Sequence, residues 1–237
     1  MREYQYIFAR EEKKYLLDEG AYHSVFAQLK PHMRPDEYGK TRVCSLYLDT
    51  PDYRLIRASM EKPVYKEKLR LRTYGIPDVQ SPAFLELKKK YRGIVYKRRV
   101  EMPLCHAMEF LEGRPNGRDG QIEREISWTL RQYPDLRPRM FLAYDRLALC
   151  GIEETDLRVT FDERILWRDG SLELTDGVWG HELMRPGQRL MEIKRMGGMP
   201  LWLSHLLDQL RIYPTSYSKY ANAYLAAQQC GKEKNYG

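Results

Sequence analysis

The stretch Val64–Tyr74, VYKEKLRLRTY, alternates cationic side chains with other residues along its whole length. One set of alternate positions holds four cations, Lys66, Lys68, Arg70 and Arg72. The other set is mixed, with Tyr65, Glu67, Leu69, Leu71 and Thr73. Because successive side chains of a β-strand point to opposite faces, this period of two predicts a strand with one wholly basic face.

Two neighbouring segments repeat this pattern. Ala83–Lys90 places Phe84, Glu86, Lys88 and Lys90 opposite Leu85 and Leu87, and Ile94–Met102 places Val95, Lys97, Arg99 and Glu101 on one face. The turn-rich segment 75–82 and the sequence Tyr91-Arg92-Gly93 separate the three stretches. We therefore predict three antiparallel strands connected in sequence order.

The rest of the chain mixes expected helices with further strands. Strands are expected at 42–49, 139–149, 156–162, 165–168 and 189–196, as well as at the start of the chain. Helices are expected at 18–33, at 103–112, at 121–133, at 200–210, at 217–229, and from Thr50-Pro51-Asp52 to about Ser59. No repeat or linker divides the sequence, so we expect one α+β domain over residues 1–237.

Basic residues are concentrated in one part of the chain. The 237 residues carry a formal net charge of +7. Between Glu61 and Val100, twelve Lys and Arg face four Asp and Glu, an excess of eight that exceeds the surplus of the whole chain. Such a concentration indicates a polyanionic partner, which is a nucleic acid, an anionic membrane or a chain of phosphates, or else a solvated basic face without a partner.

Composition argues against several other classes. The four cysteines show no CxxC spacing and the five histidines form no HxH or HxxxH pattern, so zinc is not expected. A metal would then have oxygen ligands, as Mg²⁺ and Mn²⁺ prefer. No stretch is apolar enough for a membrane span and the first residues contain no signal core, so a cytoplasmic location is expected.

Two arrangements satisfy the alternating strands. An open sheet could bury its apolar side under helices and expose its cations to water. Alternatively, an antiparallel sheet could close into a barrel with helices packed outside and charged faces meeting inside a tunnel. Like charges on neighbouring strands are destabilising, which favours a bound counter-anion such as a phosphate chain.

The sequence resembles a known family, the polyphosphate polymerase (VTC, vacuolar transporter chaperone) domain of the triphosphate tunnel metalloenzyme superfamily. The similarity runs from about Tyr6 to Leu225. It rests on segments that occur in the family's order: Glu12-Lys13-Lys14-Tyr15, residues 45–50 (SLYLDT), 69–75 (LRLRTYG), 84–88 (FLELK), Tyr144-Asp145-Arg146, 157–162 (LRVTFD), Glu192-Ile193-Lys194 and Tyr217-Ser218-Lys219-Tyr220.

The resemblance implies roles for particular residues of this chain. Catalytic contacts with phosphate oxygens are expected from Arg70, Arg72, Lys88, Arg146 and Arg158. Further substrate contacts are expected from Lys14, Lys97, Lys194, Ser216 and Lys219. Glu192 and Glu12 are the expected ligands of Mn²⁺ or Mg²⁺.

The sequence also departs from the family pattern. The superfamily opens with Glu-x-Glu-x-Lys, whereas these positions read Arg10, Glu12 and Lys14, which is closer to the polymerase branch than to the triphosphatases. Ser216 stands where related eukaryotic enzymes carry a lysine. We expect the domain to stand alone, without the regulatory domain and membrane segments of the eukaryotic assemblies.

The expected activity is therefore transfer of the terminal phosphate of ATP onto a growing polyphosphate chain. The alternatives are a triphosphatase or polyphosphatase of the same fold and a non-catalytic polyphosphate-binding module. A nucleic-acid partner is not expected, because no RNP-like aromatic motif is present. The resemblance implies a membrane protein as partner for product export, with the domain at the inner face of the membrane.

Overall fold

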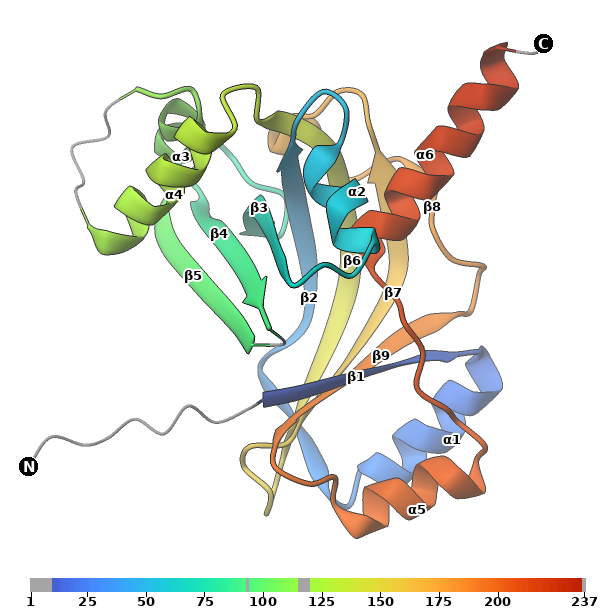
Figure 1. Ribbon diagram of the computed structural model, residues 1–237. Helices are drawn as coiled ribbons and strands as arrows, with labels where there is room; N and C mark the ends of the chain where they lie inside the picture. Colours follow the sequence, from blue (N-terminus) through green and yellow to red (C-terminus); the bar gives the residue numbers. More distant parts are fainter. Residues whose placement is uncertain (1–9, 93, 115–119, 236–237) are drawn as a thin grey trace, which may run out of the picture. The chain divides into compact units, whose positions relative to one another are not determined.

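The computed structural model describes residues 10–92, 94–114 and 120–235 (Figure 1). These residues form two compact units. Of the described residues, unit 1 comprises 10–41, 145–164 and 184–217, and unit 2 comprises 42–92, 94–114, 120–144, 165–183 and 218–235. Three strands contribute residues to both units, namely β2 (Met33–Asp49), β6 (Arg137–Gly151) and β7 (Arg158–Arg168).

In unit 1, antiparallel strands carry two helices on one face. β1 (Arg10–Leu17) pairs with β9 (Arg189–Met196), which also pairs with β7. Helices α1 (Glu19–Leu29) and α5 (Leu201–Gln209) contribute Val25, Leu29 and Leu203 to a core that also contains strand residues such as Phe161 and Ile193. The residues at the alternate positions of these strands include polar ones, and their side chains lie on the opposite face.

In unit 2, the three strands predicted from the alternating segments form a continuous antiparallel meander. They are β3 (Tyr65–Tyr74), β4 (Pro82–Tyr91) and β5 (Ile94–Pro103), and β2 pairs with β3 on the other side. Helices α3 (Leu104–Leu111) and α4 (Gln121–Gln132) share a core with the leucines of these strands, which are fully buried. The unit also contains α2 (Arg54–Met60), α6 (Lys219–Asn235), the short η1 (Leu174–Asp176) and β8 (His181–Glu182).

The predicted α+β class with an antiparallel sheet is confirmed. The strand order is β1-β9-β7-β6-β2-β3-β4-β5, with β8 pairing β7. Because the order begins at β1 and ends at β5, hydrogen bonds do not close the sheet within the part of the chain that the structure describes. None of the helices in this part is both long and apolar enough to cross a membrane.

Most predicted elements are present, but several boundaries were wrong. The first helix ends at Leu29 rather than Met33, and β2 begins at Met33, nine positions before the predicted start at Arg42. The segment 33–41 contains Pro35 and Gly39 and few apolar residues, so it shows no alternation. The predicted strands at 156–162 and 165–168 are one strand, β7. The predicted loop 113–120 includes residues outside the described part.

The predicted helix start at Thr50-Pro51-Asp52 was also wrong, because this segment forms a turn and α2 begins at Arg54. The backbone N–H groups of Leu55 and Ile56 donate to the carboxylate of Asp49, at 2.8 and 3.0 Å. The hydroxyl of Tyr220 donates to the same carboxylate at 2.8 Å. A buried carboxylate at the end of β2 therefore caps the helix and ties α6 to it.

Candidate functional site

Strand pairing in unit 1 brings acidic and basic side chains onto one face. Lys14 of β1 lies opposite Glu192 of β9, and Glu12 lies opposite Lys194. Thr160 of β7 continues the row on the other side of Glu192. Alternation explains the arrangement, because the positions between these residues supply the core under α1 and α5.

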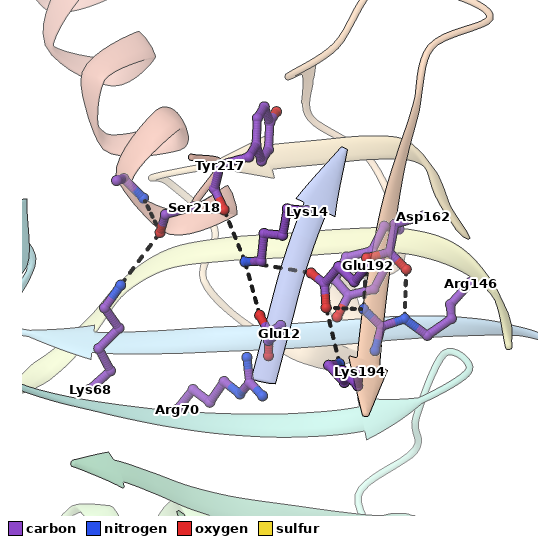
Figure 2. Close-up of polar contacts among 12 residues, drawn as sticks. Glu12, Lys14, Lys68, Arg70, Arg146, Asp162, Glu192, Lys194, Tyr217 and Ser218 are labelled. Carbon is purple, nitrogen blue, oxygen red and sulfur yellow. Dashed lines mark hydrogen bonds and ion pairs between the residues drawn. The ribbon is translucent and has the colours of Figure 1, made fainter. Parts of the chain in front are cut away.

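The Lys14 side chain is held between two carboxylates. Its Nζ lies 3.4 Å from Glu12 Oε1 and 3.6 Å from Glu192 Oε1, and it donates to the backbone carbonyl of Tyr217 at 2.9 Å (Figure 2). Lys194 Nζ lies 3.0 Å from Glu192 Oε2. Glu192 is almost fully buried, and these cations lie beside its carboxylate.

Arg146 completes this group, which we call the unit 1 cluster: Glu12, Lys14, Arg146, Asp162, Glu192 and Lys194. Arg146 donates two parallel hydrogen bonds to Asp162, from Nε at 2.6 Å and from Nη2 at 2.7 Å (Figure 2). Its Nη2 also lies 3.9 Å from Glu192 Oε2. Asp162 is fully buried, and the bidentate pair fixes the plane of the guanidinium.

The cations of unit 2 gather around a single carboxylate, that of Glu86. Arg70 Nε donates to Glu86 Oε2 at 2.7 Å, and Lys97 Nζ lies 2.8 Å from Oε1. Arg72 and Arg99 each approach the carboxylate to 3.8 Å. We call these five residues the unit 2 cluster. One negative charge faces four positive ones, so the cluster keeps a net positive charge.

The electrostatics of Glu86 follow from this geometry. Glu86 is 2% exposed, and burial alone would raise its pKa. Arg70, Arg72 and Lys97 outweigh burial and hold the pKa of Glu86 well below its usual range. The pKa of Lys97 is lowered, first by burial and also by Arg70 and Arg72, although Glu86 opposes this. The neighbouring cations thus favour the ionised carboxylate of Glu86.

Two tyrosines contact the arginines of the unit 2 cluster. Arg70 Nη1 donates to the hydroxyl of Tyr47 at 2.8 Å, and Arg72 Nη2 donates to that of Tyr144 at 3.2 Å. Burial alone would raise the pKa of Tyr47. The charges of Arg70, Arg72 and Lys68 outweigh burial and lower this pKa to about 8. Lys219 Nζ lies 4.7 Å from the centre of the Tyr144 ring.

Some of the predicted site residues contact one another or a shared partner, and others do not. Ion pairs join Glu12, Lys14, Arg146, Glu192 and Lys194 in unit 1, and Glu86 joins Arg70, Arg72 and Lys97 in unit 2. Lys219 connects to Arg72 through Tyr144. Lys88 is exposed on the same face of β4 as Glu86, one row away.

Arg158 and Ser216 lie apart from these contacts. Arg158 lies opposite Lys194 in the β7–β9 pairing, but it is exposed and forms an ion pair with Asp36. Ser216 is exposed in the segment before α6. In the part of the chain that the structure describes, nothing around these two residues points to a ligand.

Sequence reasoning named Glu12 and Glu192, but it gave no role to Glu86, Asp162 or Tyr47, which also contact the cations. Glu86 and Lys88 are two positions apart on a strand and so share one face. This shared face was the signal in the sequence that Glu86 would contact Arg70. Asp162 lies at the end of the quoted segment 157–162, yet it was given no role. For Tyr47 the sequence held no comparable signal, because its contact with Arg70 depends on the register of β2 against β3.

A family model described as the VTC domain matches residues 9–228. A search of curated proteins found no match.

Among solved structures, a Hippeastrum protein described as a "putative adenylyl cyclase" with "a dominant triphosphatase activity" aligns with TM-score 0.57 and 18% identity. The alignment covers 91% of this chain and 95% of that one. A "putative adenylate cyclase" from Bacillus halodurans aligns with TM-score 0.53 and 15% identity, covering 89% and 95% of the two chains. At these identities the likeness shows a shared fold. The family match covers almost the whole chain, and it confirms the resemblance seen in the sequence: this chain belongs to the VTC domain family.

Proposed function

We propose that this chain is a polyphosphate polymerase that transfers the terminal phosphate of ATP to the end of an inorganic polyphosphate chain. The observation that carries the proposal is the unit 2 cluster, in which four cations share the single carboxylate of Glu86. Such a surplus suits a ligand with many closely spaced negative charges. Membership of the VTC domain family favours a chain of phosphates as that ligand.

The chemistry requires little of the protein beyond positioning and charge stabilisation. A terminal oxygen of the acceptor chain, already anionic, attacks the γ-phosphorus of ATP. The bond from this phosphorus to the β–γ bridging oxygen breaks, and ADP leaves with the electron pair. No proton has to be removed from the nucleophile, which agrees with a site rich in Lys and Arg.

The proposal assigns roles within each unit separately. In unit 2, catalytic contacts with phosphate oxygens fall to Arg70, Arg72 and Lys88, and further substrate contacts fall to Lys97 and Lys219. In unit 1, catalytic contacts with phosphate oxygens fall to Arg146 and Arg158, and further substrate contacts fall to Lys14, Lys194 and Ser216. Removing one stabilising charge would cost about 3–4 kcal/mol of barrier, the magnitude known for donors to developing oxyanions.

A divalent metal fits the unit 1 cluster only together with substrate. Within the described ranges, no group of three His, Cys, Asp or Glu could hold an ion by itself. Glu12 and Glu192 are two carboxylates on the same face of paired strands, and Mg²⁺ is commonly held by one or two carboxylates plus substrate phosphates. When bound, Mn²⁺ or Mg²⁺ would neutralise charge on phosphate oxygens.

The deciding experiment is product analysis. Purified protein is incubated with γ-labelled ATP and Mn²⁺, and the products are separated on a polyacrylamide gel. We expect labelled polyphosphate, reduced about a hundredfold or more in Arg72→Ala and Glu192→Ala. Lys13→Ala is the matched control, because Lys13 is an exposed cation on the other face of β1 and its loss should leave the rate unchanged.

Three other results would overturn the proposal. Orthophosphate as the sole labelled product would identify a triphosphatase, the activity named for the Hippeastrum structure. Polyphosphate binding that survives Glu192→Ala without nucleotide turnover would identify a binding module. Displacement of polyphosphate by an equal concentration of single-stranded DNA would indicate a nucleic-acid partner.

We also propose a cytoplasmic location, with a membrane protein receiving the product.

A further inference from the structure

One face of β3, β4 and β5 changes along the strands from a buried core to an exposed surface. Under α3 and α4, this face includes leucines that are fully buried. Nearer the start of β3 it continues with Tyr65, which lies opposite Tyr91, which in turn lies opposite Ile94. These three side chains are 43%, 43% and 46% exposed. The apolar face therefore extends beyond the buried core.

Further exposed apolar side chains adjoin this row. Tyr96 lies opposite Lys89 in the next row, and Lys89 Nζ lies 5.1 Å from the ring centre of Trp128, on the helix α4 that packs against β5 (Figure 1). Val64 directly precedes β3, and its carbonyl accepts from the backbone N–H of Arg92 at 3.0 Å. We call the exposed set the outer patch: Val64, Tyr65, Tyr91, Ile94, Tyr96 and Trp128. Single apolar residues on a surface are ordinary, but a contiguous group marks an interaction site.

Cations flank the outer patch on the sheet and on the helix. The guanidinium of Arg92 lies 5.3 Å from the ring centre of Tyr91. Arg124 lies four residues before Trp128 and Arg131 three residues after it, so all three share one face of α4. Both of these arginines are exposed. Positive charge therefore borders the patch on each of the elements that form it.

The carboxylates of Glu67 and Glu125 lie near these cations, and each has a partner. Glu67 is buried and accepts from the hydroxyl of Tyr65 at 3.0 Å. Glu125 forms an ion pair with Arg98, at 3.0 Å. The cations beside the patch outnumber these two carboxylates: Lys89, Arg92, Arg98, Arg124 and Arg131. The outer patch thus combines exposed aromatic rings with a local surplus of positive charge.

This combination favours an anionic lipid surface over other occupants. Tyr and Trp suit the boundary of a bilayer because each has an apolar ring and a polar tip, and neighbouring Lys and Arg attract anionic headgroups. Two copies of the chain joined through the patch would bring like charges together. A nucleic acid would stack on the rings, but Val64 and Ile94 offer it no stacking surface.

We propose that the outer patch docks this chain directly on an anionic membrane surface. The aromatic and aliphatic side chains enter the headgroup region, and the bordering cations contact lipid phosphates. The patch lies on the face of β3, β4 and β5 opposite to the unit 2 cluster, so docking does not cover that cluster. The proposal goes beyond the proposed polymerase activity and does not depend on it.

Co-sedimentation of the full chain with protein-free vesicles tests this proposal without any membrane protein. The vesicles contain phosphatidylcholine alone or equal parts of phosphatidylcholine and phosphatidylglycerol. The apolar variant is Tyr91→Ser/Ile94→Ser, and the charge variant is Lys89→Gln/Arg92→Gln. Urea unfolding shows whether each variant is folded.

Matched controls come from unit 1. Leu201→Ser/Tyr213→Ser removes two exposed apolar side chains, and Lys13→Gln/Arg211→Gln removes two exposed cations. Each control therefore makes the same chemical change as one patch variant at residues outside the patch. A difference between variant and control then reports on the outer patch itself.

We expect the wild type to bind the anionic vesicles and to bind phosphatidylcholine alone much more weakly. The apolar variant should bind anionic vesicles about tenfold more weakly, because two side chains no longer enter the headgroup region. The charge variant should also bind about tenfold more weakly, and added salt should weaken it less than it weakens the wild type. Both controls should bind like the wild type.

Several results would overturn the proposal. It fails if the wild type does not bind anionic vesicles, if it binds both kinds of vesicle equally, or if either patch variant binds no more weakly than its control. Release of the vesicles by saturating tripolyphosphate would mean that headgroups occupy the unit 2 cluster instead. Binding of a single-stranded oligonucleotide, or a wild-type dimer in light scattering, that is lost in both patch variants while vesicles are not bound would assign the patch to nucleic acid or to a second copy. None of these results bears on ATP turnover, which tests the polymerase proposal separately.

Discussion

Glu86→Gln tests whether the buried carboxylate of unit 2 serves as an internal counter-ion. The change keeps the shape of the side chain and removes the charge that faces Arg70, Arg72, Lys97 and Arg99. Without it, four cations lie near a side chain that is 2% exposed, and their mutual repulsion is no longer offset. Breaking a buried ion pair by removing one partner typically costs about 3–5 kcal/mol.

The same variant should respond more strongly to phosphate ligands. If tripolyphosphate supplies the missing negative charge, it should restore much of the free energy of unfolding that Glu86→Gln loses. The wild type should gain less free energy of unfolding from the same ligand. The assay is urea unfolding followed by circular dichroism, with and without saturating tripolyphosphate. We expect a loss of about 3 kcal/mol without ligand and a larger ligand-induced gain than in wild type.

Glu67→Gln is the matched control. Glu67 is also buried and lies on β3, but on the opposite face, where it accepts from the hydroxyl of Tyr65 at 3.0 Å. Its variant should lose stability without gaining any additional response to tripolyphosphate. The counter-ion reasoning is refuted if Glu86→Gln is as stable as wild type, or if tripolyphosphate stabilises it no more than it stabilises Glu67→Gln.

Three further outcomes are expected. Because the pKa of Tyr47 is about 8 in the folded protein and about 10 unfolded, the native state binds fewer protons between these values. Its contribution to stability should therefore rise from pH 8 to pH 10, by up to about 3 kcal/mol; urea unfolding over this range should show a shallower rise in Tyr47→Phe, and equal slopes would contradict the assignment. Asp162→Asn should cost about 3–5 kcal/mol of unfolding free energy, because it breaks the buried bidentate pair with Arg146; a loss below 1 kcal/mol would be inconsistent with this pair. Electron paramagnetic resonance should show Mn²⁺ bound in the presence of tripolyphosphate but not in its absence, and binding should be lost in Glu192→Gln; tight binding of Mn²⁺ alone would disprove the shared coordination.

Much of the fold could be predicted from local pattern. The period of two in Val64–Tyr74 and the two segments after it specified β3, β4 and β5 and the side chains that share their basic face. This works because alternation is a property of neighbouring residues, and burial of Leu69 and Leu85 on one face leaves the cations on the other. The order of weak motifs along the chain likewise indicated the VTC domain family.

The partners of each charge were decided by tertiary structure. Glu86 meets cations from β3 and β5, and Arg158 meets Asp36, which is 122 residues away in the chain. The turn at Thr50 carries the local signals of a helix start, yet Asp49 and its contact with Tyr220 place that start at Arg54. A strand pattern states which face a side chain occupies, but strand register determines which opposite charge lies within hydrogen-bonding distance, and register depends on packing of the whole sheet.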